Sequence, residues 1–323
     1  TPLYSSAASD VYKRQVVSFL ALSAAILVGY PARSDRVVLT GNMPEKGGWQ
    51  PGVLKARAGE LLELHLTSND VVHGFAIGQM AGTEVEVLPG KFTELTVTFS
   101  EPGTYTYFCT RWCGPNHWRM RGTIEVEGED KPEDQDRPTP LYLRLGIDID
   151  AQHPAQITPG GSPSAEEGMD FLKYVPEQYL TEKVMLSTSP AELFLLLRGE
   201  SALSSLSDVN IWDLVALLYW SNTSGEELAS AGQLYADNCA ACHGVNGQGD
   251  GVFAGADAQQ ETPTDFTDSE QMLGASSALL QGKIIRGGMG TGMPYWGPIF
   301  TEEQTWSLVN YLWSMQFDYP VDK

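Results

Sequence analysis

Hydrophobic and polar positions follow different periods in the two halves of this chain. Between Leu61 and Leu66, apolar and polar residues alternate with the two-residue period of a half-buried strand. Near the C-terminus, Trp306, Val309 and Leu312 recur at three-residue intervals, which places them on one face of a helix and predicts that this face is buried. The pattern therefore predicts a β-rich region followed by a helical one.

Two capping boxes mark where helices of the second half begin. Ser224-Gly-Glu-Glu227 opens a helix that runs toward a pair of cysteines, and Thr301-Glu-Glu-Gln304 opens the helix that carries Trp306. In each box a hydroxyl and an acidic or amide side chain, three residues apart, satisfy free backbone N–H groups. We expect helices to start at both sites.

The middle of the chain separates the two regions. Residues 129–140 are rich in charge and proline, which predicts a solvated linker. Within the following segment, residues 141–222, Arg198-Gly199 and a helix around Trp212 parallel Arg286-Gly287 and the helix around Trp306. This segment is either a degenerate copy of the helical module after it, used for packing, or an ordinary amphipathic helix pair.

The N-terminal region contains the one long apolar run. Residues 16–30 are uncharged but shorter than the about 20 residues that a membrane span needs. They are either a truncated membrane anchor or a secretory signal, and both predict export. Residues 1–15, TPLYSSAASDVYKRQ, resemble a translated sequencing adapter and are expected to be non-native.

Composition narrows the class of protein. The 323 residues suffice for two or three domains of ordinary size, and 42% of them are apolar. A net charge of −21 argues against nucleic-acid binding, which needs clustered basic residues. The chemistry must then be sought in the four cysteines, which form two close pairs.

The second pair has the C-x-x-C-H spacing of covalent haem attachment, with Cys239 and Cys242 as thiols and His243 as the adjacent axial imidazole. A zinc site would need a second pair of ligands, which this region lacks. A methionine downstream would provide the second axial ligand of the haem iron, and Met289 and Met293 are the candidates.

The first pair has a different pattern, C-x3-C-x3-H-x2-M, formed by Cys109, Cys113, His117 and Met120. A mononuclear blue-copper site uses one cysteine, whereas two thiolates on one loop can bridge two copper ions. His73, at the end of the alternating stretch, is the candidate for the missing histidine. The alternative is a disulfide with a surface histidine beside it.

Residues 36–128 resemble the cupredoxin domain of subunit II of haem–copper oxidases, which binds the binuclear copper centre CuA, and residues 225–320 resemble a class I cytochrome c domain. The resemblance implies a multidomain chain, an all-β sandwich followed by all-α cytochrome c-like domains. It implies copper ligation by the residues named above and by the backbone carbonyl of Arg111, and it selects Met293 over Met289. Many such subunits carry glutamate where this chain has Arg111, so we do not expect their magnesium site.

The implied function is electron transfer within a cytochrome c oxidase, from an external donor through haem c to copper and then to subunit I, where oxygen is reduced. The donor would be a cytochrome c, a cupredoxin or a bc-type complex, and the soluble domains would lie on the extracytoplasmic face of the cell membrane. The alternatives are the corresponding subunit of a nitric oxide or nitrous oxide reductase and a free periplasmic electron carrier.

Overall fold

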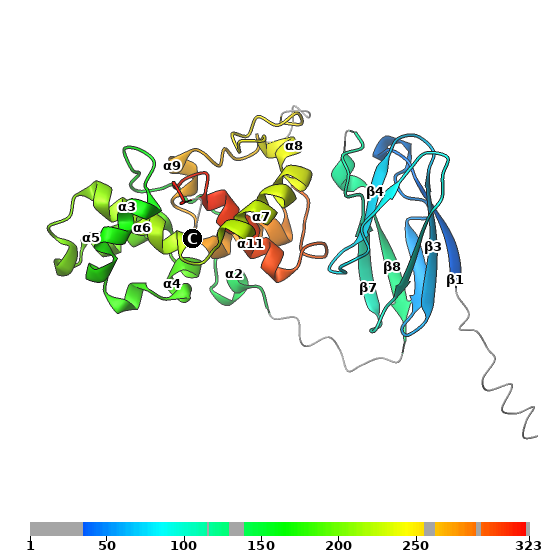
Figure 1. Ribbon diagram of the computed structural model, residues 1–323, viewed down its shortest axis with the longest axis horizontal. Coiled ribbons are helices and arrows are strands. Elements are labelled where there is room, and N and C mark those ends of the chain that lie inside the picture. Colours follow the sequence, from blue (N-terminus) through cyan, green and yellow to red (C-terminus); the bar gives the residue numbers. More distant parts are fainter. Residues whose placement is uncertain (1–34, 115, 129–138, 255–261, 289–291, 321–323) are drawn as a thin grey trace, which may run out of the picture.

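The computed structural model describes residues 35–114, 116–128, 139–254, 262–288 and 292–320. They form a β-sandwich followed by a helical half (Figure 1). This confirms the predicted order of a sheet-rich region and a helical region. The predicted non-native residues 1–15, the anchor or signal at 16–30 and most of the linker at 129–140 lie outside the described residues. Among the residues described, no helix has the length and hydrophobicity to cross a membrane.

The sandwich contains eight strands in two sheets. The first sheet has the order β1-β3-β6 and the second the order β2-β8-β7-β4-β5. Their bounds are β1 (Asp35–Gly41), β2 (Val53–Arg57), β3 (Leu61–Ser68), β4 (His73–Ile77), β5 (Val85–Val87), β6 (Thr93–Thr98), β7 (Gly103–Phe108) and β8 (Arg121–Glu127). β1 pairs with β3 and β2 with β8 in parallel, and the remaining pairs are antiparallel.

Alternation in β3 works as the sequence predicts. Leu62, Leu64 and Leu66 are buried, while the residues between them are partly accessible. They pack against residues of the second sheet, among them Phe75 and Tyr107, to form the core of the sandwich. The two sheets are thus held face to face by one apolar layer, and the loops at their ends are free to carry ligands.

The helical half consists of several short helices packed around a few longer ones. Its α-helices are α2 (Leu141–Arg144), α3 (Ala165–Gly168), α4 (Glu182–Ser187), α5 (Pro190–Arg198), α6 (Asp208–Trp220), α7 (Gly225–Asn238), α8 (Ala240–His243), α9 (Ser269–Met272), α10 (Ser277–Arg286) and α11 (Glu302–Trp313). The 3-10 helices within the described residues are Pro44–Lys46, His117–Arg119, Met169–Tyr174, Glu177–Tyr179 and Ser201–Leu203. Residues from both 141–222 and 225–320 share one hydrophobic core.

Both predicted capping boxes are present, at the start of α7 and of α11. The buried face of α11 differs slightly from the predicted one. Val309 and Leu312 are buried, but Trp306 is only half-buried, and Leu308 and Trp313 occupy the core instead. The face is displaced because α11 packs on several neighbours, including α6, α7 and α10, rather than along one line of contact.

Two pairs of helices in this half approach each other at a glycine. α7 crosses α11 where Gly232 lies against the ring of Tyr311, so that a Cβ atom there would lie 3.0 Å from the ring. α3 crosses α6 where Gly168 lies against the backbone of Asp213, and a Cβ atom would lie 2.3 Å from its carbonyl oxygen. The crossing of α3 on α6 therefore requires glycine, whereas a larger residue at Gly232 would only press on the ring of Tyr311.

Candidate functional site

The predicted copper ligands converge at one end of the sandwich. His73 is the first residue of β4, and Cys109 directly follows β7, which pairs with β4 through Ala76 and Phe108. Because the two strands are antiparallel neighbours, the start of one lies beside the end of the other. The loop after Cys109 then folds back through the 3-10 helix His117–Arg119 and enters β8 at Arg121.

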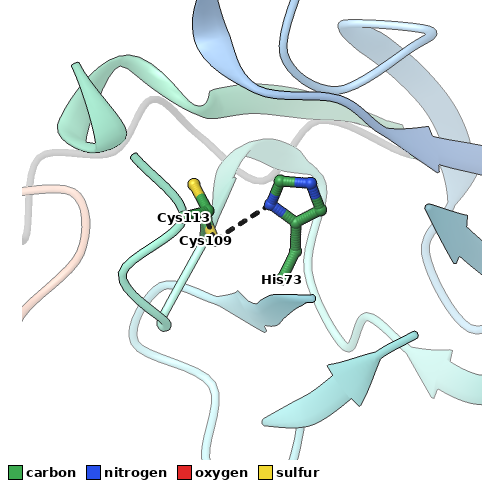
Figure 2. Close-up of side chains that lie close together, drawn as sticks. All are labelled: His73, Cys109 and Cys113. Atoms are coloured by element: carbon green, nitrogen blue, oxygen red, sulfur yellow. Dashed lines mark hydrogen bonds between the residues drawn. The ribbon is translucent and has the colours of Figure 1, made fainter. Parts of the chain in front are cut away.

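The sulfur and nitrogen atoms of this loop lie close together. The Sγ atoms of Cys109 and Cys113 are 3.9 Å apart, and Nδ1 of His73 lies 3.8 Å from Cys109 Sγ (Figure 2). On the other side, Cys113 Sγ lies 3.4 Å from Nδ1 of His117 and 3.6 Å from Sδ of Met120. The two thiols are therefore flanked by one imidazole each, with a thioether beside the second.

The backbone provides one more oxygen. The carbonyl oxygen of Arg111 lies 3.1 Å from Sγ of Cys109, so this oxygen points into the cluster. The side chain of Arg111 turns away and pairs with Glu86, beside which it lies at the surface. All six groups that the sequence predicted as copper ligands are thus assembled at one place.

Burial makes this cluster suitable for a soft metal. His73 has no exposed surface, Met120 is 1% exposed, and both thiols are nearly as well covered. All four cysteines of the chain are free thiols in this structure, and no disulfide joins Cys109 to Cys113. Thiolate, imidazole and thioether donors together are the set that copper prefers, so the residues present fit that metal.

The pKa values of the two thiols are shifted in opposite directions. Hydrogen bonding from Cys113 lowers the pKa of Cys109 to about 3, against the opposing effect of burial, with the two imidazoles also contributing. The pKa of Cys113 is correspondingly raised, because it donates to that thiolate and lies beside its negative charge. One thiolate is thus available in the metal-free site, and a cation is needed to displace the second proton.

Asp70 is a residue of the candidate site that the sequence reasoning missed. Its Oδ1 atom lies 3.0 Å from Nε2 of His73, on the side of the ring opposite Cys109. The backbone N–H groups of Met43 and Val71 donate to the same carboxylate, and they lower its pKa although burial acts in the opposite direction. Asp70 therefore fixes the ring so that Nδ1 faces the thiols. Its position three residues before His73 was the available signal.

The candidate haem site follows helix α7. Cys239 ends this helix, and Cys242 and His243 lie in α8. Nδ1 of His243 lies 3.2 Å from the carbonyl oxygen of Thr264, which orients the ring and leaves Nε2 for an iron ligand. The ring stacks on Phe266 with centroids 4.4 Å apart, and burial lowers the pKa of His243, so the neutral imidazole is favoured. These features fit a covalently bound haem.

The loop that carries the predicted sixth ligand is partly described. Met293 lies within it, and its carbonyl accepts a hydrogen bond from the N–H of Gly288 at 3.2 Å. Met289, the alternative candidate, lies outside the described residues. The choice of Met293 as the iron ligand therefore stays a prediction.

Two segments of the chain match models of known protein families. Residues 56–127 match the family model described as cytochrome C oxidase subunit II, periplasmic domain, and residues 229–316 match that of cytochrome c. Each match covers one of the two candidate sites.

Two curated relatives, both named cytochrome c oxidase subunit 2 and both from Thermus thermophilus, are 39% identical to this chain over 80 residues. That alignment covers 25% of this chain and 58% and 47% of the relatives, so the chain spans about half the length of the curated relatives that it matches.

Solved structures give weaker similarity. The periplasmic domain of subunit II of cytochrome oxidase from Bradyrhizobium japonicum is 19% identical, with a TM-score of 0.27, over 30% of this chain and 87% of that one. A haem–copper terminal oxidase dimer contains a chain that is 22% identical, with a TM-score of 0.26, over 38% of this chain and 97% of that one. The family models and the curated relatives confirm the resemblance predicted from the sequence: this chain carries a segment similar to the periplasmic domain of cytochrome c oxidase subunit II, followed by a cytochrome c segment.

Proposed function

We propose that this chain is the electron-transfer subunit, subunit II, of a haem–copper oxidase, with a binuclear copper centre and a covalent haem c in one polypeptide. The observation that carries the proposal is the joint presence of the two sites. Six candidate copper ligands converge in the sandwich, and a C-x-x-C-H motif with an oriented histidine lies in the helical half. The two matched families support the same combination.

In the copper site, Cys109 and Cys113 would bridge two ions, with His73 and His117 as the terminal ligands. Met120 and the carbonyl of Arg111 would be the weak ligands. Copper held in this way accepts and releases single electrons. The protein contributes a buried, preformed site in which Asp70 holds one imidazole and hydrogen bonds hold the loop, so little needs to move when the charge changes.

In the haem site, Cys239 and Cys242 would bind the macrocycle, and His243 and Met293 would complete the iron coordination. Haem c held by histidine and methionine carries single electrons and has no open position for a substrate. Oxygen reduction is accordingly assigned to a partner, subunit I, and electron supply to an external donor. The donor-facing half is acidic, with thirteen acidic against three basic residues between positions 221 and 323, which favours a basic donor surface and weaker docking at high salt.

We place these soluble domains on the extracytoplasmic face of a cell membrane, as the matched periplasmic-domain family suggests. Detergent extraction of native membranes tests the assignment. We expect the chain to co-purify with a large haem-bearing membrane subunit that reduces oxygen. A chain recovered as a soluble monomer with both cofactors would instead identify a free electron carrier, and co-purification with a nitric oxide or nitrous oxide reductase would identify that alternative.

For residues 141–222 we propose a degenerate cytochrome-like module without haem. Two features support this proposal beyond the repeated sequence. The capping boxes at Ser207 and Thr301 each stand five residues before a tryptophan, Trp212 or Trp306. The crossing of α3 on α6 at a glycine also repeats the crossing of α7 on α11. An experimental structure in which residues 164–220 fail to superpose on the corresponding helices of 224–313 would contradict the proposal.

A further inference from the structure

The copper loop and the haem-binding loop touch across the boundary between the two halves. The ring of Trp112, from the copper loop, lies 4.6 Å from the ring of Phe253, measured between centroids. Trp118 approaches the same phenylalanine edge-on at 5.9 Å. In Figure 1, α8, which precedes Phe253 in the chain, lies on the side of the helical half that faces the sandwich.

On the copper side, Trp112 connects directly to a candidate ligand. Its ring lies 5.6 Å from the ring of His117, whose Nδ1 atom faces Cys113. Trp112 remains 44% exposed, and it does not belong to the hydrophobic core of the sandwich. Packing within its own domain therefore does not account for a tryptophan between the two cysteines.

On the haem side, Phe253 is hydrogen-bonded to the haem-attachment motif. Its backbone N–H donates to the carbonyl of Ala241 at 2.9 Å, and Ala241 lies between Cys239 and Cys242. The nearby N–H of Gly251 donates to the carbonyl of Cys242 at 3.2 Å. Phe253 is thus held by the segment that would carry the haem.

Polar contacts hold this boundary closed. Arg121, which directly follows Met120, donates to the carbonyl of Tyr295 at 2.7 Å and lies over the rings of Tyr295 and Trp296. The backbone N–H of Gln79 donates to the carbonyl of Ile299 at 3.0 Å, and its side chain donates to that of Gly297 at 2.7 Å. The residues contacted on the helical side follow Met293 within a few positions. A predicted metal ligand therefore lies close in sequence to the boundary on each side, Met120 in the sandwich and Met293 in the helical half.

We propose that Trp112 and Phe253 form the route by which an electron passes between the haem and the copper centre of the same chain. This inference rests on the proposed function. In the step, the haem iron gives up one electron and is oxidised, and the copper pair gains that electron and is reduced. No bond breaks and no proton moves. Electron tunnelling is faster through bonds and touching rings than across gaps, and the contacts above run from Ala241 through Phe253 and Trp112 to His117.

The test uses the full chain loaded with both cofactors. Less than one equivalent of a photochemical one-electron reductant is added, and the redistribution of the electron is followed in the haem and copper absorption bands. Trp112→Leu and Phe253→Leu remove a ring but keep apolar bulk, and we expect a several-fold slower redistribution in each. Trp112→Phe and Phe253→Tyr keep a ring and should retain most of the rate. Phe92→Leu, at an exposed ring elsewhere on the sandwich, is the matched control.

A second readout does not depend on electron transfer. Hydrogen exchange of the Gln79 amide in copper-free protein reports whether the boundary stays closed, and the leucine variants should leave it protected. Unchanged rates in both leucine variants would overturn the route. So would a fall in rate matched by lost protection at Gln79, because separation of the two halves would then explain it. Wild-type protein without haem or copper bands would reject the proposed function instead.

Discussion

Arg121 allows the strength of the contact between the two halves to be predicted. Its guanidinium extends from the start of β8 into the helical half, where it donates to a carbonyl and covers two aromatic rings. Burial lowers the pKa of Arg121 to about 10, but the group stays charged at neutral pH. Replacing it with glutamine removes the charge and shortens the side chain, while a polar group remains.

The magnitude follows from these contacts. A hydrogen bond from a charged group contributes roughly 1.5–3 kcal/mol, and a cation over an aromatic ring adds about 0.5–2 kcal/mol. Burying the group offsets roughly 1–3 kcal/mol of this, since Nη2 has no hydrogen-bond partner among the described residues. We therefore expect Arg121→Gln to weaken docking by about 1–2 kcal/mol, a factor of roughly 5–30 in the equilibrium between closed and open forms.

Amide hydrogen exchange measures this equilibrium at one atom. The N–H of Gln79 bonds to Ile299 across the boundary, whereas the N–H of the preceding residue, Gly78, bonds to Thr106 within the sandwich. In Arg121→Gln, protection at Gln79 should fall by the factor above, while protection at Gly78 should stay the same. The two adjacent amides thus separate opening of the boundary from loosening of the sandwich.

Arg36→Gln provides the control. It makes the same change of charge at a side chain that is 67% exposed and pairs with Glu63 on the surface. Its effect at Gln79 should be negligible, because exposed ion pairs contribute little. Equal protection of Gln79 in wild type and Arg121→Gln would refute the role of Arg121 in docking.

Two further predictions concern single residues in the two halves. Met120→Leu conserves volume, so it should change the free energy of unfolding by less than about 1.5 kcal/mol. Because it removes the sulfur that lies 3.6 Å from Cys113, it should shift the copper spectrum and potential without loss of copper, and complete loss of copper would contradict a weak-ligand role. Burial raises the pKa of Asp213 above 3.8, although the hydrogen bond from the N–H of Ser164 acts in the opposite direction. The contribution of Asp213 to stability is therefore greatest below pH 3.8 and is lost as the pH rises through the raised pKa. Asp213→Asn should abolish this dependence in thermal unfolding measured against pH, and an identical pH profile in both proteins would contradict it.

Local patterns predicted much of the fold and the composition of both sites. The strand β3 could be predicted from its alternation because one face of the strand is buried. The capping boxes could be predicted because their partners lie three residues apart. The copper loop could also be predicted from local sequence, since four of its candidate ligands fall within twelve residues. His73 lies much earlier in the chain and was found through its position at the end of an alternating stretch.

Interactions between distant segments were not predictable in the same way. Arg121 and Tyr295 are 174 positions apart, and nothing in the local sequence of either residue indicates the other. The contact of Trp112 with Phe253 likewise depends on how the sandwich meets the helical half. Even within α11, the share of Trp306 in the core was overestimated, because the helices packed around it decide which face is buried.

Electron paramagnetic resonance of the oxidised, copper-loaded full chain tests the central claim most directly, since the ferric haem absorbs at a different field from the copper. If Cys109 and Cys113 bridge two ions, the unpaired electron is shared and the spectrum shows hyperfine splitting from two equivalent copper nuclei. Splitting from a single copper nucleus, or a chain that binds no copper and links these cysteines in a disulfide, would contradict the account.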